Sequence, residues 1–393
     1  MNDPLPRVAL LVQGDEEYGV GQVARALAAE LQRRGGKPAL IALEEGALTK
    51  HFRAEAMACR VLGLPAWPPF ERSVWKTAKT MIGQRFRLRR ASHILAACLD
   101  ELSADQLVVQ WPAHVELAGH ACRRAGIAAQ WMMPNVVSDR WPLGLNRRFY
   151  RQLCRRLQIT PLPNSRYTAN SLGLDVRGQV LYLGVDETRF APDRVTALTR
   201  AELGLPKDAY VAGVFARLDP SKGQEVLWRA MLALLNEGHD LHLLLVGGPA
   251  DNHFANQLRD IARESNATAR LHFAGWSDEP ERYYDAIDFA VNSTIIPESF
   301  GLSVVEAMSM GRPILVHALG GPAETVVDGV TGWHVPQPTV EAFTTGLRRA
   351  MRDRPRWPEL GQAARRHALE HFSASTFVSN YLRIIGKGNS GGE

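Results

Sequence analysis

Residues 210–248 read YVAGVFARLDPSKGQEVLWRAMLALLNEGHDLHLLLVGG. The stretch opens with a short apolar run, passes through a loop with proline and glycine, continues with helical periodicity, and closes with a second apolar run. A strand, a helix and a strand in this order form a βαβ unit, whose two strands are parallel. Both strands have apolar residues on both faces, which is typical of a sheet covered by helices on both sides.

The same alternation continues on either side of this unit. Further β-rich runs, most of them followed by loop and helix signals, occupy residues 7–14, 37–44, 106–111, 128–133, 270–276, 288–293 and 312–318. We therefore predict an α/β protein built from two doubly wound, Rossmann-like domains that face each other across a cleft.

The chain length supports two domains. At 393 residues the chain exceeds the roughly 250–300 residues at which a single core stops growing. A strand-like run gives way to a stretch with Gly, Asp and Pro at 181–193. We predict an N-terminal domain over 1–183, a C-terminal domain over 184–372, and a final helix at about 373–386 that packs back on the first domain.

The composition is that of an ordinary globular protein, 46% hydrophobic and 22% charged. The longest apolar runs fall well short of the roughly 18 residues needed to cross a bilayer, so we expect a cytoplasmic protein. The four cysteines are far apart and form no CxxC pair, which fits a reducing compartment and indicates no zinc site: Cys59, Cys98, Cys122 and Cys154.

Positive charge is concentrated in the first half of the chain. Residues 1–170 hold 24 Lys and Arg against 14 Asp and Glu, and residues 171–393 hold 22 against 27. Two segments, 76–90 and 146–156, mix cations with apolar side chains. They are either helices that lie on an anionic membrane surface or two solvated helices with ordinary polar faces. The chain shows no recognised nucleic-acid-binding module, so we expect no nucleic acid partner.

Ligands of an open α/β sheet bind outside the carboxyl ends of its strands, so residues directly after each strand are candidate site residues. Arg217 and Lys222, beside a helix start, form either a diphosphate clamp or two solvated loop cations. Gly247 allows a ligand to approach the backbone closely. Gly275 and Trp276 are either a shelf for a flat base or a turn glycine beside a core tryptophan.

The sequence PESFGLSVVEAM, residues 297–308, carries two carboxylates. Glu298 lies in a Pro/Ser/Gly stretch, and we place it at the end of a strand. Glu306 lies in an apolar, helix-like run. Because a buried carboxylate is costly without hydrogen-bond donors, we predict that Glu306 accepts hydrogen bonds from a vicinal diol such as ribose.

Together these motifs closely resemble the C-terminal domain of glycosyltransferase family 4, of GT-B fold, over about residues 160–340. The resemblance implies a retaining transfer of a sugar from a nucleotide-diphosphate donor to a glycan, lipid-linked or small-molecule acceptor. Arg217 and Lys222 match the residues that hold the diphosphate. Glu298 matches the family's residue that contacts the donor sugar, and Glu306 matches the residue that contacts the ribose. The backbone amides expected at the phosphates are those of Phe300, Gly301 and Leu302.

The first half matches the family less closely. Gly19 and Gly21 correspond to its Gly-rich loop after the first strand. Many members carry a histidine where this chain has Met-Pro-Asn at 133–135. His114 is of the same type at a different strand, and serves either as the replacement catalytic group or as a structural residue.

We expect no cofactor and no metal. The chain contains no Asp-x-Asp sequence, so fixed cations would neutralise the leaving nucleotide diphosphate. Three other functions stay open: a sugar-nucleotide epimerase of the same fold, a non-catalytic nucleotide-sugar-binding subunit, and, weakly, a nicotinamide dehydrogenase. For the last, residues 19–24 read GVGQVA and end on Ala24 where the dinucleotide-binding motif has glycine. The expected role is polysaccharide or glycoconjugate biosynthesis, in the cytoplasm or on the inner face of the cytoplasmic membrane.

Overall fold

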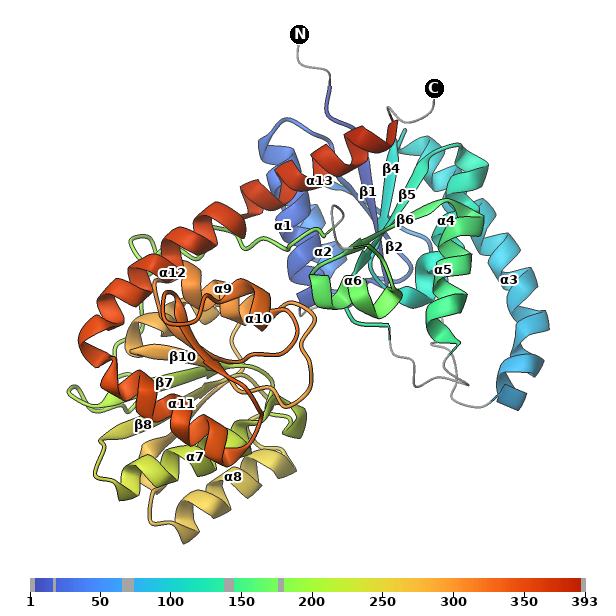
Figure 1. Ribbon diagram of the computed structural model, residues 1–393. Helices are drawn as coiled ribbons and strands as arrows, with labels where there is room; N and C mark the ends of the chain where they lie inside the picture. Colours follow the sequence, from blue (N-terminus) through green and yellow to red (C-terminus); the bar gives the residue numbers. More distant parts are fainter. Residues whose placement is uncertain (1–3, 17–18, 66–73, 138–144, 176–179, 390–393) are drawn as a thin grey trace. The chain divides into compact units, whose positions relative to one another are not determined.

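The computed structural model describes residues 4–16, 19–65, 74–137, 145–175 and 180–389 (Figure 1). The chain divides into two compact units, one of residues 1–184 together with 377–393 and one of residues 185–376. Each unit has its own parallel sheet covered by helices. The predicted α/β class with two doubly wound sheets is confirmed.

The sheet of the first unit has six parallel strands in the order β3-β2-β1-β4-β5-β6. The order reverses between β1 and β4, and a sheet of this kind binds ligands at that switch point. The strands are β1 (Val8–Val12), β2 (Ala39–Ala42), β3 (Ala58–Val61), β4 (Gln106–Val109), β5 (Ala128–Met133) and β6 (Ile159–Pro163).

Helices connect these strands on both faces of the sheet (Figure 1). They are α1 (Gly19–Arg33), α2 (Ala47–Ala54), α3 (Val74–Glu101), α4 (Val115–Ala125), α5 (Asn146–Leu157) and α6 (Arg166–Leu172). The final helix, α13 (Ala374–Asn389), adds its residues from 377 onward to this unit. There Tyr381 is fully buried and its hydroxyl donates to Gln130 of β5 at 3.4 Å.

The sheet of the second unit is also parallel, in the order β12-β11-β10-β7-β8-β9, and reverses between β7 and β10. Its strands are β7 (Tyr210–Phe215), β8 (Leu241–Val246), β9 (Leu271–Gly275), β10 (Phe289–Asn292), β11 (Ile314–His317) and β12 (Gly332–Val335). Its helices are α7 (Gln224–Asn236), α8 (His253–Glu264), α9 (Leu302–Ser309), α10 (Pro322–Thr325), α11 (Val340–Arg352) and α12 (Trp357–His371).

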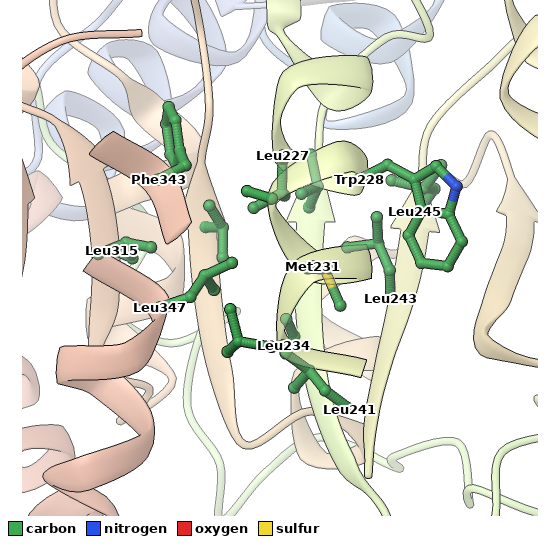
Figure 2. Close-up of a cluster of buried hydrophobic side chains, with 14 of the residues drawn as sticks. Leu227, Trp228, Met231, Leu234, Leu241, Leu243, Leu245, Leu315, Phe343 and Leu347 are labelled. Atoms are coloured by element: carbon green, nitrogen blue, oxygen red, sulfur yellow. The ribbon is translucent and has the colours of Figure 1, made fainter. Parts of the chain in front are cut away.

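The opening stretch 210–248 forms the βαβ unit β7-α7-β8, as predicted. Figure 2 shows Leu227, Trp228 and Met231 of α7 among leucines of β8, with Phe343 and Leu347 of α11 on the other side. Complete burial of such side chains contributes roughly 1.5–3 kcal/mol each, so this layer is a main source of the unit's stability.

Three local predictions require correction. Residues 181–185 form no strand: the Leu181 N–H donates to the carbonyl of Pro163 at the end of β6 at 2.8 Å, and Val185 makes an isolated bridge to Ser373. The edge strands β3 and β6 were not expected from the sequence. β3 is largely solvent-accessible, and β6 contains Pro161 and Pro163, so neither has the apolar character of the central strands.

Candidate active site

An ion pair lies at the switch point of the second sheet. Lys222 follows β7, Glu298 follows β10, and Lys222 Nζ lies 3.3 Å from Glu298 Oε1. The other carboxylate oxygen of Glu298 accepts from the side-chain amide of Asn292 at 2.9 Å. Both charged side chains are about one-fifth exposed, so the pair can be reached from solvent.

The loops that carry this pair are hydrogen-bonded to each other. The Ser293 hydroxyl donates to the Lys222 carbonyl at 2.8 Å, and the Ile295 N–H donates to the Ser221 carbonyl at 3.0 Å. Gly223 lies between the loops at φ +67°, and a Cβ there would come within 2.0 Å of the Ser293 carbonyl oxygen. The sequence therefore needs glycine at this position to bring the two loops together.

The sequence had suggested that Glu298 lies at the end of a strand, and the structure shows that it does not. β10 ends at Asn292, and Glu298 lies six residues further along the loop. It is positioned instead by a parallel bridge to Gly320, and its carbonyl accepts from the Gly321 N–H at 2.8 Å. The loop after β11 thus supports the loop after β10.

Arg217 is exposed in the loop directly after β7. Its carbonyl accepts from the buried Gln224 side chain at 2.7 Å, which fixes the backbone of the loop to the start of α7. Arg217 is thus an exposed cation on a backbone that is held in place. Arg217 and Lys222 lie on the same loop: Arg217 precedes the 3₁₀ turn Pro220–Lys222, and Lys222 is the last residue of that turn.

Gly247 directly follows β8, and Gly275 is the last residue of β9. Gly247 has φ +146°, and a Cβ there would meet the Ala216 carbonyl oxygen at 2.0 Å. Its N–H donates to the carbonyl of Gly275 at 2.7 Å, which joins the ends of β8 and β9. Trp276 follows with 56% of its surface exposed, so it is not the core tryptophan that was one of the two interpretations.

Glu306 is buried in the second turn of α9 at 6% exposure, as its apolar neighbours predict. Burial raises its pKa to about 7, and the positive charge of Arg189 partly opposes that rise in the pKa. Arg189 is held by two contacts to Glu281, at 2.9 and 2.8 Å. The fully buried Tyr284 faces the same carboxyl, and burial together with the Glu306 charge raises the Tyr284 pKa.

Sequence reasoning missed Arg189, Glu281 and Tyr284. Arg189 lies far from Glu306 in the sequence, and none of the three lies directly after a strand, where candidate site residues were sought. The indirect signal was Glu306 itself, because a carboxylate in an apolar helix requires a partner.

The start of α9 is formed by Phe300, Gly301 and Leu302. Gly301 takes the left-handed conformation at φ +89° immediately before the helix. The Phe300 ring is buried and packs edge-on against Phe372. The backbone of these residues therefore starts the helix next to the loop that carries Glu298.

The candidate residues of the first unit lie beside β1 and β4. Gly19 and Gly21 are in the first turn of α1, and a Cβ at Gly21 would lie 2.1 Å from the Glu16 carbonyl oxygen. Close packing therefore accounts for glycine at 21. His114 is buried after β4, and burial lowers its pKa to about 4, so its imidazole is neutral at pH 7.

No cluster of three or more His, Cys, Asp or Glu side chains suited to a metal ion occurs among the residues that the structure describes. Across those same residues, no helix combines the length and apolar character needed to cross a membrane.

Comparison with known proteins agrees with this architecture. Residues 195–367 match the family described as glycosyl transferases group 1. The D-inositol 3-phosphate glycosyltransferase of Salinispora arenicola is 33% identical over 225 residues, 54% of this chain and 50% of that protein. Its Mycobacterium bovis counterpart is 31% identical over 249 residues, 60% of this chain and 50% of that protein. The chain thus spans about half the length of the curated relatives it matches.

Solved structures match almost the whole chain. A glycosyltransferase from Rickettsia africae has a TM-score of 0.81 at 18% identity, covering 98% of this chain and 99% of its own. Anabaena HepE, solved with UDP and glucose, has a TM-score of 0.76 at 18% identity, covering 98% and 100%. The chain therefore has the GT-B fold of these glycosyltransferase structures, and its residues 195–367 match the family described as glycosyl transferases group 1.

Proposed function

We propose that this protein is a retaining glycosyltransferase that moves a sugar from a nucleotide-diphosphate donor to a glycan, lipid-linked or small-molecule acceptor. The observation that carries the proposal is the Lys222–Glu298 pair at the switch point of the second sheet. The pair supplies a cation for the phosphates and a carboxylate for sugar hydroxyls, and the two loops that carry them are hydrogen-bonded to each other.

The donor lies along the carboxyl edge of the second sheet in this proposal. Arg217 and Lys222 follow β7, Gly247 follows β8, and Trp276 follows β9, so the groups proposed to bind the phosphates and the base come directly after three neighbouring strands. The exposed Trp276 ring offers a stacking surface for the nucleobase. Anabaena HepE was solved with UDP and with UDP-glucose, which makes uracil the first base to test.

Charge stabilisation is the main catalytic contribution that we assign to this chain. Cleavage of the bond between sugar and phosphate leaves negative charge on the nucleotide diphosphate, and preformed cations lower the energy of that transition state. Lys222 and Arg217 take this role. Glu298 would accept hydrogen bonds from the donor sugar, and Glu306 from the ribose.

A nucleotide panel tests donor binding. UDP, GDP and ADP sugars are added singly, and the shift in melting temperature is measured. A ligand at a hundred times its dissociation constant stabilises the fold by about 2.7 kcal/mol, which such a scan detects. A shift with one base that disappears in Arg217→Ala/Lys222→Ala, and persists in the remote Arg263→Ala control, supports the proposal. No shift with any nucleotide sugar contradicts it.

A second measurement separates transferase from epimerase and from a binding subunit. Release of free nucleotide diphosphate is followed with and without a candidate acceptor. A transferase releases it in an acceptor-dependent manner, an epimerase interconverts the donor without an acceptor, and a binding subunit does neither. The double alanine variant should lose turnover by about a hundredfold or more while keeping its fold.

We further propose that the first unit meets an anionic membrane on its cytosolic face through a basic and apolar surface. Phe86 on α3 is 77% exposed among exposed arginines, and Leu145 and Phe149 at the start of α5 are 45% and 38% exposed. Helices α3 and α5 both pack on α4. The exposed cations are Arg85, Arg87, Arg89, Arg90, Arg148, Arg155 and Arg156, whereas the side chains of Lys76 and Lys79 lie outside the described ones.

Each Lys or Arg near an anionic leaflet contributes about 1 kcal/mol, so this surface would bind reversibly. Co-sedimentation with anionic and neutral vesicles at low and high salt tests it. Binding to anionic vesicles alone, lost in high salt and in the variant with serine at 85, 87, 89 and 90, supports membrane attachment. No sedimentation with either vesicle at low salt favours a soluble acceptor.

A further inference from the structure

A buried carboxylate lies at the switch point of the first sheet. Glu16, in the loop after β1, is only 6% exposed. Its Oε1 accepts from the backbone N–H of Gln13 at 2.6 Å and from the indole N–H of Trp111 at 2.8 Å, and its Oε2 accepts from the Gly14 N–H at 2.8 Å. Trp111 follows β4, so this one carboxylate joins the loops of the two strands where the sheet order reverses.

Backbone N–H groups that converge on one point at a strand end form a binding site for an anion such as phosphate. In this chain Glu16 itself occupies that point. A carboxylate has about four lone-pair directions, and three are used here, so one remains for a hydroxyl donor. A second anion beside this carboxylate would be repelled, because little water is present to screen the two charges.

Unpaired polar atoms mark the same edge of the sheet. Within the described residues, Gln13 Nε2 and His114 Nδ1 are buried atoms with no hydrogen-bond partner. Gln13 is itself a donor to Glu16, and the His114 N–H donates to the Trp111 carbonyl at 3.0 Å, so both residues adjoin the carboxylate's partners. Buried polar atoms are almost always paired in folded proteins, so these two atoms are available to hydrogen-bond a group that reaches this edge.

We propose that Glu16 makes the edge between β1 and β4 a binding point for an uncharged, hydroxyl-bearing part of the acceptor, and that it excludes phosphate and other anions from that point. Glu16 is then a specificity-determining residue. The inference rests on the proposed function only in assigning the acceptor to the first unit.

Titration with inorganic phosphate, followed by NMR of the full chain at constant ionic strength, tests the exclusion of anions. The reporters are the Trp111 indole and the amides of Gln13 and Gly14. They should not shift saturably in the wild type, which sets a lower limit on its dissociation constant for phosphate. In Glu16→Ala and Glu16→Gln they should shift saturably, with a dissociation constant at least about tenfold below that limit. Glu45→Gln is the matched control, because it removes an exposed carboxylate from the neighbouring loop after β2.

Two results would overturn the inference: a saturable phosphate shift at these reporters in the wild type, or the absence of such a shift in both folded Glu16 variants. If Glu16→Ala does not fold, Glu16→Gln decides, because it retains the side-chain volume. Circular dichroism of each variant checks the fold.

A second titration tests the preference for an uncharged group. The probes are myo-inositol and D-inositol 3-phosphate, the compound in the names of the curated relatives. In the wild type the uncharged probe should bind more tightly at the same reporters, and in Glu16→Gln the ratio of dissociation constants should move at least about tenfold toward the phosphate ester. A wild-type preference for the ester would contradict the inference. Neither titration contains a donor, so failure of sugar transfer would overturn the proposed function alone.

Discussion

The Nζ atom of Lys222 lies 3.3 Å from Oε1 of Glu298, although 76 residues separate them in the sequence. The pair joins the loops after β7 and β10, the two strands between which the strand order of the second sheet reverses. In the proposed reaction the donor diphosphate competes with Glu298 for Lys222. The ion pair thus holds both side chains in place before the donor arrives, and donor binding exchanges one anionic partner for another.

Removing Lys222 and removing Glu298 should have different effects on donor binding. Lys222→Met removes the phosphate partner and should weaken nucleotide diphosphate binding by about 1.5–3 kcal/mol, the range for hydrogen bonds to charged groups. Glu298→Gln removes the carboxylate that competes with the diphosphate for Lys222. Nucleoside diphosphate binding should therefore be unchanged or tighter, while sugar turnover falls. Isothermal titration with the free diphosphate, compared with steady-state turnover, measures both. Equal losses of diphosphate affinity in the two variants would contradict these separate roles.

The buried Glu306 should make nucleotide binding depend on pH. Its pKa is raised to about 7 by burial, so the carboxyl is neutral in mildly acidic solution and ionised above pH 7. Because an ionised carboxylate accepts stronger hydrogen bonds from a ribose diol, affinity should increase as pH rises through about 7. In Glu306→Gln that dependence should disappear, with a loss of about 1.5–3 kcal/mol at high pH. Unchanged affinity at high pH would remove Glu306 from the ribose site.

The raised pKa of Glu306 also predicts how the stability of the folded protein changes with pH. A pKa raised in the folded state means that the folded protein binds more protons than the unfolded chain between the ordinary value of 4.5 and about 7. Glu306 therefore contributes stability below this window and loses that contribution as pH rises through it. The melting temperature of Glu306→Gln relative to the wild type should increase from pH 5 to pH 8. The exposed Glu341→Gln is the control and should show no such trend.

Gly223 should tolerate no side chain. Gly223→Ala places a Cβ about 2.0 Å from the Ser293 carbonyl oxygen and forces a positive φ, so both the fold and the site geometry should suffer. Gly238→Ala is a matched control, because Gly238 also has a positive φ, +87°, and has nothing within 4 Å of the added carbon. We expect about 1 kcal/mol of destabilisation in the control, from backbone strain alone, and a clearly larger loss at Gly223. Chemical denaturation of both variants measures the difference, and equal losses would show that the contact to Ser293 is relieved at little cost.

Chelation tests whether Arg217 and Lys222 neutralise the leaving diphosphate without a bound metal ion. Because the proposal assigns neutralisation of the leaving diphosphate to Arg217 and Lys222, activity should survive treatment with EDTA. The measurement is turnover before and after chelation, followed by addition of magnesium or manganese. Complete loss that a metal restores would show that a bound cation shares this role.

Much of the fold follows from local sequence. Strands such as β8 and helices such as α7 are specified by apolar periods of neighbouring residues and by glycine and proline at their ends, so they could be predicted without a structure. The candidate donor residues Arg217, Lys222 and Glu298 could be found for the same reason, since each lies in a short loop that follows a recognisable strand.

The tertiary structure decided the features that depend on distant parts of the chain. Whether 181–185 or 58–61 becomes a strand depends on a neighbour to pair with, which local periodicity does not report. The arginine beside Glu306 and the tryptophan beside Glu16 are likewise distant in sequence, the latter by 95 residues. The sequence by itself determined that Glu306 needs a partner, because an apolar helix cannot solvate a carboxylate. Only folding decided which groups meet that carboxylate, because the sheet order, and not proximity along the chain, brings them together.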